Sequence, residues 1–177
     1  ELGEYQKAID HYEKSLEITT EIGDRTGIAS NNCNLGNAYR NLGKNQKAIE
    51  CCEKGLEIFT EIGDRPEIAN TNSRLGNVYR KLGEYKKAID YHEKGLQIAT
   101  EIGNRSTIAV NIDNLADCYR RLGEYHKAID YHEESLQVST EIGDRYLIAC
   151  TNSNLGIAYC CLRQYDVGAS YLMKSIL

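Results

Sequence analysis

The sequence lacks the features that direct a chain to a membrane or to nucleic acid. No apolar stretch approaches the roughly 18 residues that a membrane-spanning helix needs, and no signal-peptide pattern opens the chain. Lys and Arg number 21 against 26 Asp and Glu, and both signs are spread along the chain without a basic run. A nucleic-acid-binding protein would show such a run or patch. We therefore expect a cytoplasmic protein that binds neither membrane nor nucleic acid.

Metal-binding spacings are missing as well. The seven cysteines are odd in number and match no known ligand pattern. Most of them stand where another copy of an internal repeat has Ala, Ser, Tyr or Arg. This favours small, weakly polar filler residues in a reducing compartment over a metal or redox site. We expect no metal and no cofactor.

Signatures of catalysis are also absent. Segments 92–96 and 132–136 begin with His-Glu, like the H-E-x-x-H motif of zinc proteases, but each ends in leucine instead of the second histidine. No G-x-S-x-G motif, no Gly-rich phosphate loop and no paired carboxylates with a suitable base are present. We therefore expect a protein that is not an enzyme, has no small-molecule substrate, and has His92 and His132 as packing or surface residues.

What the sequence has instead is a 40-residue repeat. The segment "LGEYKKAIDYHEKGL" at 82–96 recurs with small changes at 2–16, 42–56 and 122–136. Self-similarity at a fixed period of this length is the signature of stacked repeats, in which each unit packs against its neighbours. The only methionine is Met173, and the chain begins inside the repeated unit. We expect it to be a piece of a longer protein.

Each repeat contains two helical patterns. In the first copy, apolar residues recur at the three-and-four spacing of one helix face near 26–42 and again near 45–62. Gly43 stands where a left-handed C-terminal cap is wanted, and Gly63 followed by Asp64 ends one helix and begins the next. Connections this short predict antiparallel helical hairpins. The two apolar stripes are Ile28, Ala29, Leu35, Ala38, Tyr39 and Leu42, and then Ala48, Ile49, Cys52, Gly55, Leu56 and Phe59.

Small residues recur inside both helices at fixed places. The first helix has Gly36, Gly76, Ala116 and Gly156 at one position, and the second has Ala48, Ala88 and Ala128 at another. A glycine inside a helix costs about 0.5 to 1 kcal/mol relative to alanine, so its return in several copies needs a compensating reason. We expect that reason to be a close approach of the two helix axes.

These positions carry a family resemblance. In a frame written from residue 30, the segment "NLGNAYRNLGKNQKAIECCEKGLEI" sets Leu35, Gly36, Tyr39, Gly43, Ala48 and Gly55 at the signature spacings of the tetratricopeptide repeat, and residues 70, 110 and 150 open the same frame again. With its 40-residue period and the "EIGDR" joint, the chain looks most like the G-protein-signalling-modulator group (LGN and Pins) and related long arrays. The resemblance implies an all-α, right-handed superhelical solenoid of antiparallel helical hairpins. The first helices of the hairpins should then line a concave groove that grips peptides.

The resemblance covers the whole chain, which we expect to be one array over 1–177. Its parts should be the second helix of a preceding repeat at 1–23, repeat 1 at 24–63, repeat 2 at 64–103, repeat 3 at 104–143 and a truncated repeat 4 at 144–177. Arg163 replaces the glycine that recurs in the hairpin turn. We expect the last hairpin to be atypical, as terminal repeats are.

Positions that vary between repeats are the candidates for ligand binding. On the first helix, residues 30, 33, 37, 40 and 41 form a stripe beside the buried face, and the resemblance implies that this stripe and its equivalents face the groove. The candidate peptide-binding residues are Asn37, Arg40, Asn77, Arg80, Lys81, Asp117, Arg120, Arg121 and Ile157.

The chemistry of this stripe predicts an extended, acidic peptide as ligand. The amides would hydrogen-bond the peptide main chain, and the guanidinium groups would each meet a carboxylate in two bonds. Asp113 and Asp117 are able instead to tether Arg120 and Arg121 within the protein. In the fourth repeat the stripe turns apolar, and Ile157 would hold a hydrophobic residue of the peptide. The plain alternative is a solvated face without a dedicated ligand.

Two functions follow from this sequence. The first is a protein–protein interaction scaffold that binds the peptide in its concave groove, as in signalling or polarity adaptors. The alternative is a regulatory segment of a larger enzyme whose catalytic domain lies outside this chain.

Overall fold

The computed structural model describes residues 2–176, and over that range it consists of helices joined by short turns, without a strand. The all-α prediction is confirmed; the two ends of the expected array, positions 1 and 177, lie outside the described residues. Four hairpins follow a single leading helix. The helices are α1 (Leu2–Glu21), α2 (Arg25–Asn41), α3 (Asn45–Ile62), α4 (Arg65–Lys81), α5 (Tyr85–Glu101), α6 (Arg105–Arg121), α7 (Tyr125–Ile142), α8 (Arg145–Cys161) and α9 (Tyr165–Lys174).

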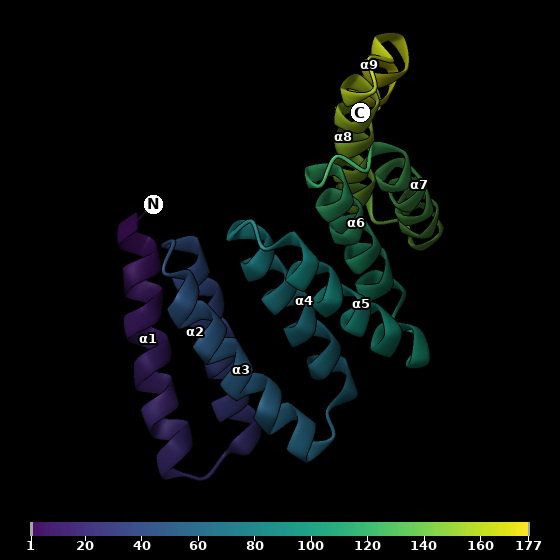
Figure 1. The fold of residues 1–177 in the computed structure, drawn as a ribbon. Helices are drawn as coiled ribbons and strands as arrows, with labels where there is room; N and C mark the ends of the chain where they lie inside the picture. Colours follow the sequence, from purple (N-terminus) through teal and green to yellow (C-terminus); the bar gives the residue numbers. More distant parts are fainter. Residues whose placement is uncertain (1, 177) are drawn as a thin grey trace.

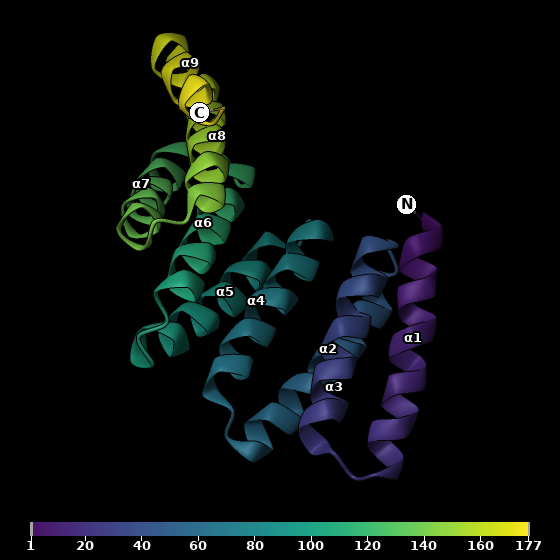
Figure 2. The ribbon, with the colours of Figure 1, turned by 180° about the vertical axis from the view of Figure 1, so that it is seen from behind.

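The hairpins stand in a row in the order of the sequence, with the two termini at opposite ends (Figures 1 and 2). The first helices of neighbouring hairpins contact one another: α2 meets α4, α4 meets α6 and α6 meets α8. Within residues 2–176, the second helices α3, α5 and α7 make no such contacts among themselves. A row in which one set of helices touches while the other is spread apart is curved, so α2, α4, α6 and α8 line its concave side.

The turns form because glycine stands at fixed places. Gly43 has a φ of 76°, and its N–H donates to the carbonyl of Arg40 at 3.0 Å, while the N–H of Lys44 donates to the carbonyl of Tyr39 at 2.9 Å. This is the Schellman arrangement, which satisfies the last carbonyls of a helix. Asp64 then caps α4, because its side chain accepts from the N–H of Glu67 at 3.2 Å. The predicted caps are confirmed.

Close helix approach explains the recurring glycines. A Cβ atom built on Gly36 would lie 3.1 Å from the carbonyl oxygen of Ala48, and one built on Gly55 would lie 3.0 Å from that of Ala29. Real Cβ contacts are rarely this short, so the backbones of α2 and α3 touch where the side chain is missing. The cost of glycine in the helix interior is thus offset by packing of backbone against backbone.

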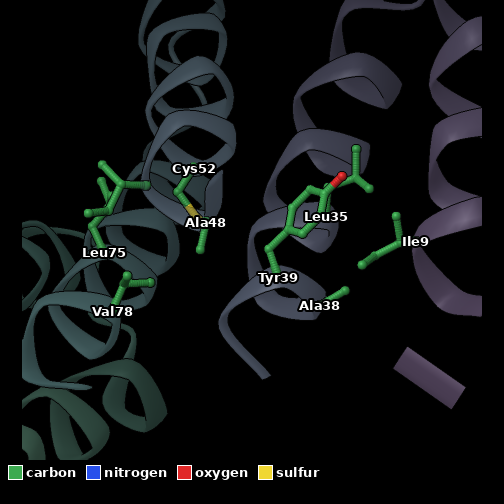
Figure 3. Close-up of a cluster of buried hydrophobic side chains, with 9 residues drawn as sticks. Ile9, Leu35, Ala38, Tyr39, Ala48, Cys52, Leu75 and Val78 are labelled. Carbon is green, nitrogen blue, oxygen red and sulfur yellow. The ribbon is translucent and has the colours of Figure 1, made fainter. Parts of the chain in front are cut away.

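Apolar side chains join the hairpins into one core. Ile9 of α1, Leu35 and Tyr39 of α2, Ala48 and Cys52 of α3, and Leu75 and Val78 of α4 lie in one buried cluster (Figure 3). Leu75 is fully buried, although it belongs to the next hairpin along the chain. Each hairpin therefore completes the core of its neighbour. No helix among residues 2–176 is both long enough and apolar enough to cross a membrane.

Candidate functional site

The last turns of α2, α4 and α6 and the first turn of α5 surround an open pocket of about 460 Å³ on the concave side. We call it the basic pocket. It gathers five of the predicted site residues from three repeats, together with two further residues. Its lining residues are Arg40, Asn41, Asn77, Arg80, Lys81, Tyr85 and Arg121. Four of the seven are cationic and none is acidic.

Helix ends place these cations. Arg40 lies in the last turn of α2, Arg80 and Lys81 in that of α4, and Arg120 and Arg121 in that of α6. Basic side chains are favoured there because the C-terminal end of a helix carries roughly half a negative charge. The Lys81 ammonium shows the effect across a repeat boundary, since it donates to the backbone carbonyl of Arg40 at 2.5 Å.

One carboxylate, that of Asp117, contacts three arginines of α4 and α6. Asp117 accepts from Arg80 Nη1 at 2.8 Å, pairs with Arg120, and lies 3.8 Å from Arg121 Nε. Arg80 also donates through Nη2 to Asn77 at 3.2 Å. Burial by itself would raise the pKa of Asp117, but Arg120 and Arg80 outweigh this and hold the pKa below its ordinary value. Of the two alternative tethers, the one by Asp117 is present: it holds Arg120 and, at 3.8 Å, Arg121, and it also holds Arg80. Asp113 contacts His132 and Asn154 instead.

Arg40 and Lys81 stand in a different position. Within residues 2–176, neither lies within 4.0 Å of a carboxylate, and the Arg40 guanidinium donates only to the amide of Asn41, at 3.3 Å. Burial and the nearby charge of Arg80 lower the pKa of Arg40. With no carboxylate of residues 2–176 within 4.0 Å, the positive charge of Arg40 is poorly compensated by the protein itself.

Asp113 does not face the groove, contrary to the stripe prediction. Its carboxylate accepts from Asn154 Nδ2 at 3.1 Å and lies 2.8 Å from Nδ1 of the fully buried His132. His92 is buried in the same way in the preceding repeat, 3.2 Å from Asn111 Oδ1, and burial lowers its pKa to about 4. Both histidines pack in the interior, which decides between the packing and surface positions that the sequence left open.

Two more stripe positions are buried rather than exposed. Cys33 packs beside Gly55, and Ser73 donates to Asn111 at 2.8 Å beside Gly95. The small residue on the second helix leaves space that the side chain from the first helix fills. The stripe prediction was wrong at these positions, because a helical wheel does not show where the partner helix leaves such space.

The remaining predicted residues lie outside the basic pocket. Asn37 lines a neighbouring recess of about 220 Å³ between α1 and α2, which it shares with Asn41 and two tyrosines, Tyr5 and Tyr12. Ile157 on α8 is 39% exposed and is not part of either hollow. Asn41 thus connects the two hollows, while Ile157 belongs to a separate part of the concave side.

Sequence reasoning missed Tyr85. It begins α5 and lines the basic pocket, although it belongs to the second helix of its hairpin. The signal was present, since the same position holds Tyr5, Tyr125 and Tyr165 in other copies. A residue that recurs in the repeats indicates a role in packing, whereas Tyr85 also lines the pocket.

Comparison with known proteins identifies the family. A tetratricopeptide repeat profile matches residues 26–101 and 106–176, and a second profile of that name matches residues 1–26. The chain belongs to the tetratricopeptide repeat family. No curated protein matches this tetratricopeptide chain. Its membership agrees with the row of hairpins and with the position of the first helices on the concave side.

Solved structures of similar fold differ widely in sequence. BtubC from P. vanneervenii superimposes with a TM-score of 0.83 at 20% identity, over 97% of this chain and 72% of that one. A Rap protein complexed with competence and sporulation factor superimposes with a TM-score of 0.87 at 19% identity, over 98% of this chain and 49% of the Rap chain. A signal-transduction ATPase with a tetratricopeptide repeat sensor, from Pyrococcus horikoshii, superimposes with a TM-score of 0.82 at 23% identity, over 98% of this chain and 28% of the ATPase chain. The chain therefore spans about half of the Rap protein and less of the ATPase, and these likenesses show the fold alone.

Proposed function

We propose that this tetratricopeptide array is a protein-interaction scaffold that binds an extended, acidic peptide along its concave side. One observation carries the proposal: four cations from three successive first helices line one pocket without an acidic side chain among its lining residues. An arginine binds a carboxylate through two parallel hydrogen bonds. The amides of Asn41 and Asn77 in the same pocket would hydrogen-bond the peptide main chain. The tetratricopeptide fold typically serves protein–protein interaction, so no catalytic group is required. The resemblance to the LGN and Pins group and the cytoplasmic location stay predictions.

The roles within the site differ from residue to residue. Arg40, Lys81 and Arg121 are the cations that we assign to the peptide, because Asp117 engages Arg80 and Arg120 closely and approaches Arg121 only through Nε, at 3.8 Å. Arg80 and Arg120 then contribute their positive charge and the shape of the pocket wall. Asn37 would hydrogen-bond the peptide main chain in the recess beside α1, and Ile157 would contact an apolar residue farther along the groove.

A peptide array tests this proposal. The chain is applied to short acidic peptides and to the same peptides with Gln and Asn in place of Glu and Asp. We expect acidic peptides to be retained, and Arg40→Glu to weaken their binding about tenfold or more, since one attractive charge becomes repulsive. Lys94→Glu, on the exposed side of α5, makes the same change of charge and should leave binding unchanged. Equal binding by wild type and Arg40→Glu, with normal helicity in both, would refute the site.

The alternative function, a regulatory segment of a larger enzyme, is favoured by one observation. The Pyrococcus horikoshii ATPase carries a tetratricopeptide repeat sensor and resembles this chain in fold, while the chain covers 28% of it. Sequencing of the parent transcript beyond both ends separates the two cases. A catalytic domain there supports the regulatory role, and further repeats or binding motifs support the scaffold.

A further inference from the structure

We propose that the basic pocket recognises a phosphorylated side chain of the bound peptide, as a phosphate dianion, rather than a carboxylate alone. The inference rests on the proposed function, since it takes the groove to hold a peptide and names the group that the pocket selects.

The charge balance of the pocket calls for a dianion. Against the cations stand one carboxylate, Asp117, and the C-terminal ends of α2, α4 and α6, each equivalent to roughly half a negative charge. The N-terminal end of α5 adds roughly half a positive charge, so roughly three positive charges remain uncompensated. A peptide carboxylate supplies one negative charge, whereas a phosphomonoester carries about 1.5 to 2 at neutral pH. The cations counted are Arg40, Arg80, Lys81, Arg120 and Arg121.

The geometry of the donors also suits phosphate. Asp117 and Asn77 already engage the two terminal nitrogens of Arg80. The donors left for a ligand are Arg40 on α2, Lys81 on α4 and Arg121 on α6, so they reach the pocket from three helices. A carboxylate offers two oxygens in one plane, while a phosphate offers three oxygens in a tetrahedral arrangement. Three converging cations can therefore each take a separate phosphate oxygen.

Asp117 shows how a single carboxylate behaves at this place. It pairs with Arg80 and Arg120, yet Arg40 and Lys81 still have no carboxylate within 4.0 Å in the described part of the chain. The pKa of Arg40 remains lowered by burial and by the charge of Arg80 despite that internal carboxylate. One added carboxylate would compensate one of these cations, and a dianion would compensate both.

A phosphopeptide fits better than a nucleic acid. Polynucleotides bind to basic surfaces that contact several phosphates in succession. Here the chain carries a net charge of −5, and Arg40, Lys81 and Arg121 line one pocket of about 460 Å³. Such a site matches one phosphate on an otherwise neutral or mildly acidic chain.

Three degenerate peptide libraries test the inference, identical except for a central residue fixed as serine, glutamate or phosphoserine. We expect the phosphoserine library to bind the chain about tenfold or more tightly than the glutamate library, and the serine library to bind weakest. Lys81→Gln and Arg40→Gln should each remove most of the preference for phosphoserine. The matched control is Lys54→Gln on the exposed side of α3, which should retain the full preference.

The outcomes separate this inference from the proposed function. Equal binding of the phosphoserine and glutamate libraries would overturn phosphate recognition while the acidic-peptide function stands. No binding by either library would overturn both. Inorganic phosphate or free phosphoserine that competes as effectively as the phosphopeptide would point to a small phosphorylated compound, and displacement by a short RNA at similar concentration would point to nucleic acid; either result would contradict a phosphopeptide site.

Discussion

Arg163 holds a backbone conformation that glycine holds in every other hairpin turn and repeat joint of the described chain. Its φ is 62°, and its N–H donates to the carbonyl of Cys160 at 3.0 Å, so the turn keeps its usual bonds without glycine. A left-handed conformation costs a residue with a Cβ roughly 1 to 2 kcal/mol. The last hairpin keeps the turn of the other hairpins at this position, and the expectation that this hairpin is atypical stays a prediction.

Arg163→Gly should therefore raise the free energy of unfolding by about 1 kcal/mol, measured by urea denaturation. Arg163→Ala is the matched control, because it removes the same side chain and keeps the Cβ. We expect no gain from the alanine variant. An equal gain from both variants would show that the arginine side chain, and not its backbone, was responsible.

Asp117→Asn should lower the free energy of unfolding by about 2 kcal/mol at pH 7, because it removes the charge that Arg80 and Arg120 share. The pKa of Asp117 is lower in the folded chain than its ordinary value of about 3.9. Its stabilisation is therefore fully present above about pH 4 and is lost as the pH falls through the lower, folded-state pKa.

The measurement is urea denaturation of wild type and variant from pH 7 down to about pH 3. We expect the difference between them to shrink over the acid part of this range. Asp90→Asn, an exposed carboxylate on α5, serves as control and should differ from wild type by less than about 0.5 kcal/mol throughout. A difference for Asp117→Asn that does not vary with pH would contradict the assigned ion pairs.

At the scale of the helix, stability should depend on leucines of one hairpin that are buried in the core of the neighbouring hairpin. Leu75 on α4 is fully buried in the cluster that includes Leu35 of α2 and Ala48 of α3. Leu75→Ala should cost about 2 to 5 kcal/mol of unfolding free energy, measured by urea denaturation. Leu82 is the C-cap of the same helix and is 41% exposed, so Leu82→Ala should cost less than about 1 kcal/mol. Similar costs at the two sites would contradict a core shared between hairpins.

The helices themselves were predictable from the sequence. The apolar pattern near 26–42 predicts a helix that the structure has at Arg25–Asn41, and the pattern near 45–62 predicts one that it has at Asn45–Ile62. Such agreement is possible because local residues, Gly43 and the Gly63–Asp64 pair, determine where these helices end and begin.

The faces of the helices were harder to predict. The first helices α2, α4 and α6 each contact their hairpin partner and helices of both the preceding and the following repeat. A helical wheel gives the angle of each residue but does not say which neighbouring helix lies at that angle. Cys33 of α2 fills the space that Gly55 leaves on α3. Asp113 of α6 contacts His132 of α7, which lies 19 residues farther along the chain. Contacts of this kind depend on how the two helices of a hairpin are rotated against each other, which the pattern of one helix alone does not show.

At the scale of the molecule, the candidate site exists only because repeats stack. No single hairpin supplies the basic pocket, since Arg40, Arg80 and Arg121 come from three successive repeats. Sequence reasoning gathered these residues by their equivalent positions and by the family resemblance, and the curvature brings them to one pocket. It did not show that Asp117 would hold Arg80, which depends on the offset between α4 and α6.

Photo-crosslinking tests most directly whether the concave side binds acidic peptide. A photoreactive amino acid replaces Asn41 on the concave side in one variant and Lys54 on the opposite side of the hairpin in another. After irradiation with a bound acidic peptide from the array, we expect a covalent adduct from position 41 and none from position 54. An adduct from position 54 alone, or equal adducts from both, would contradict binding in the groove.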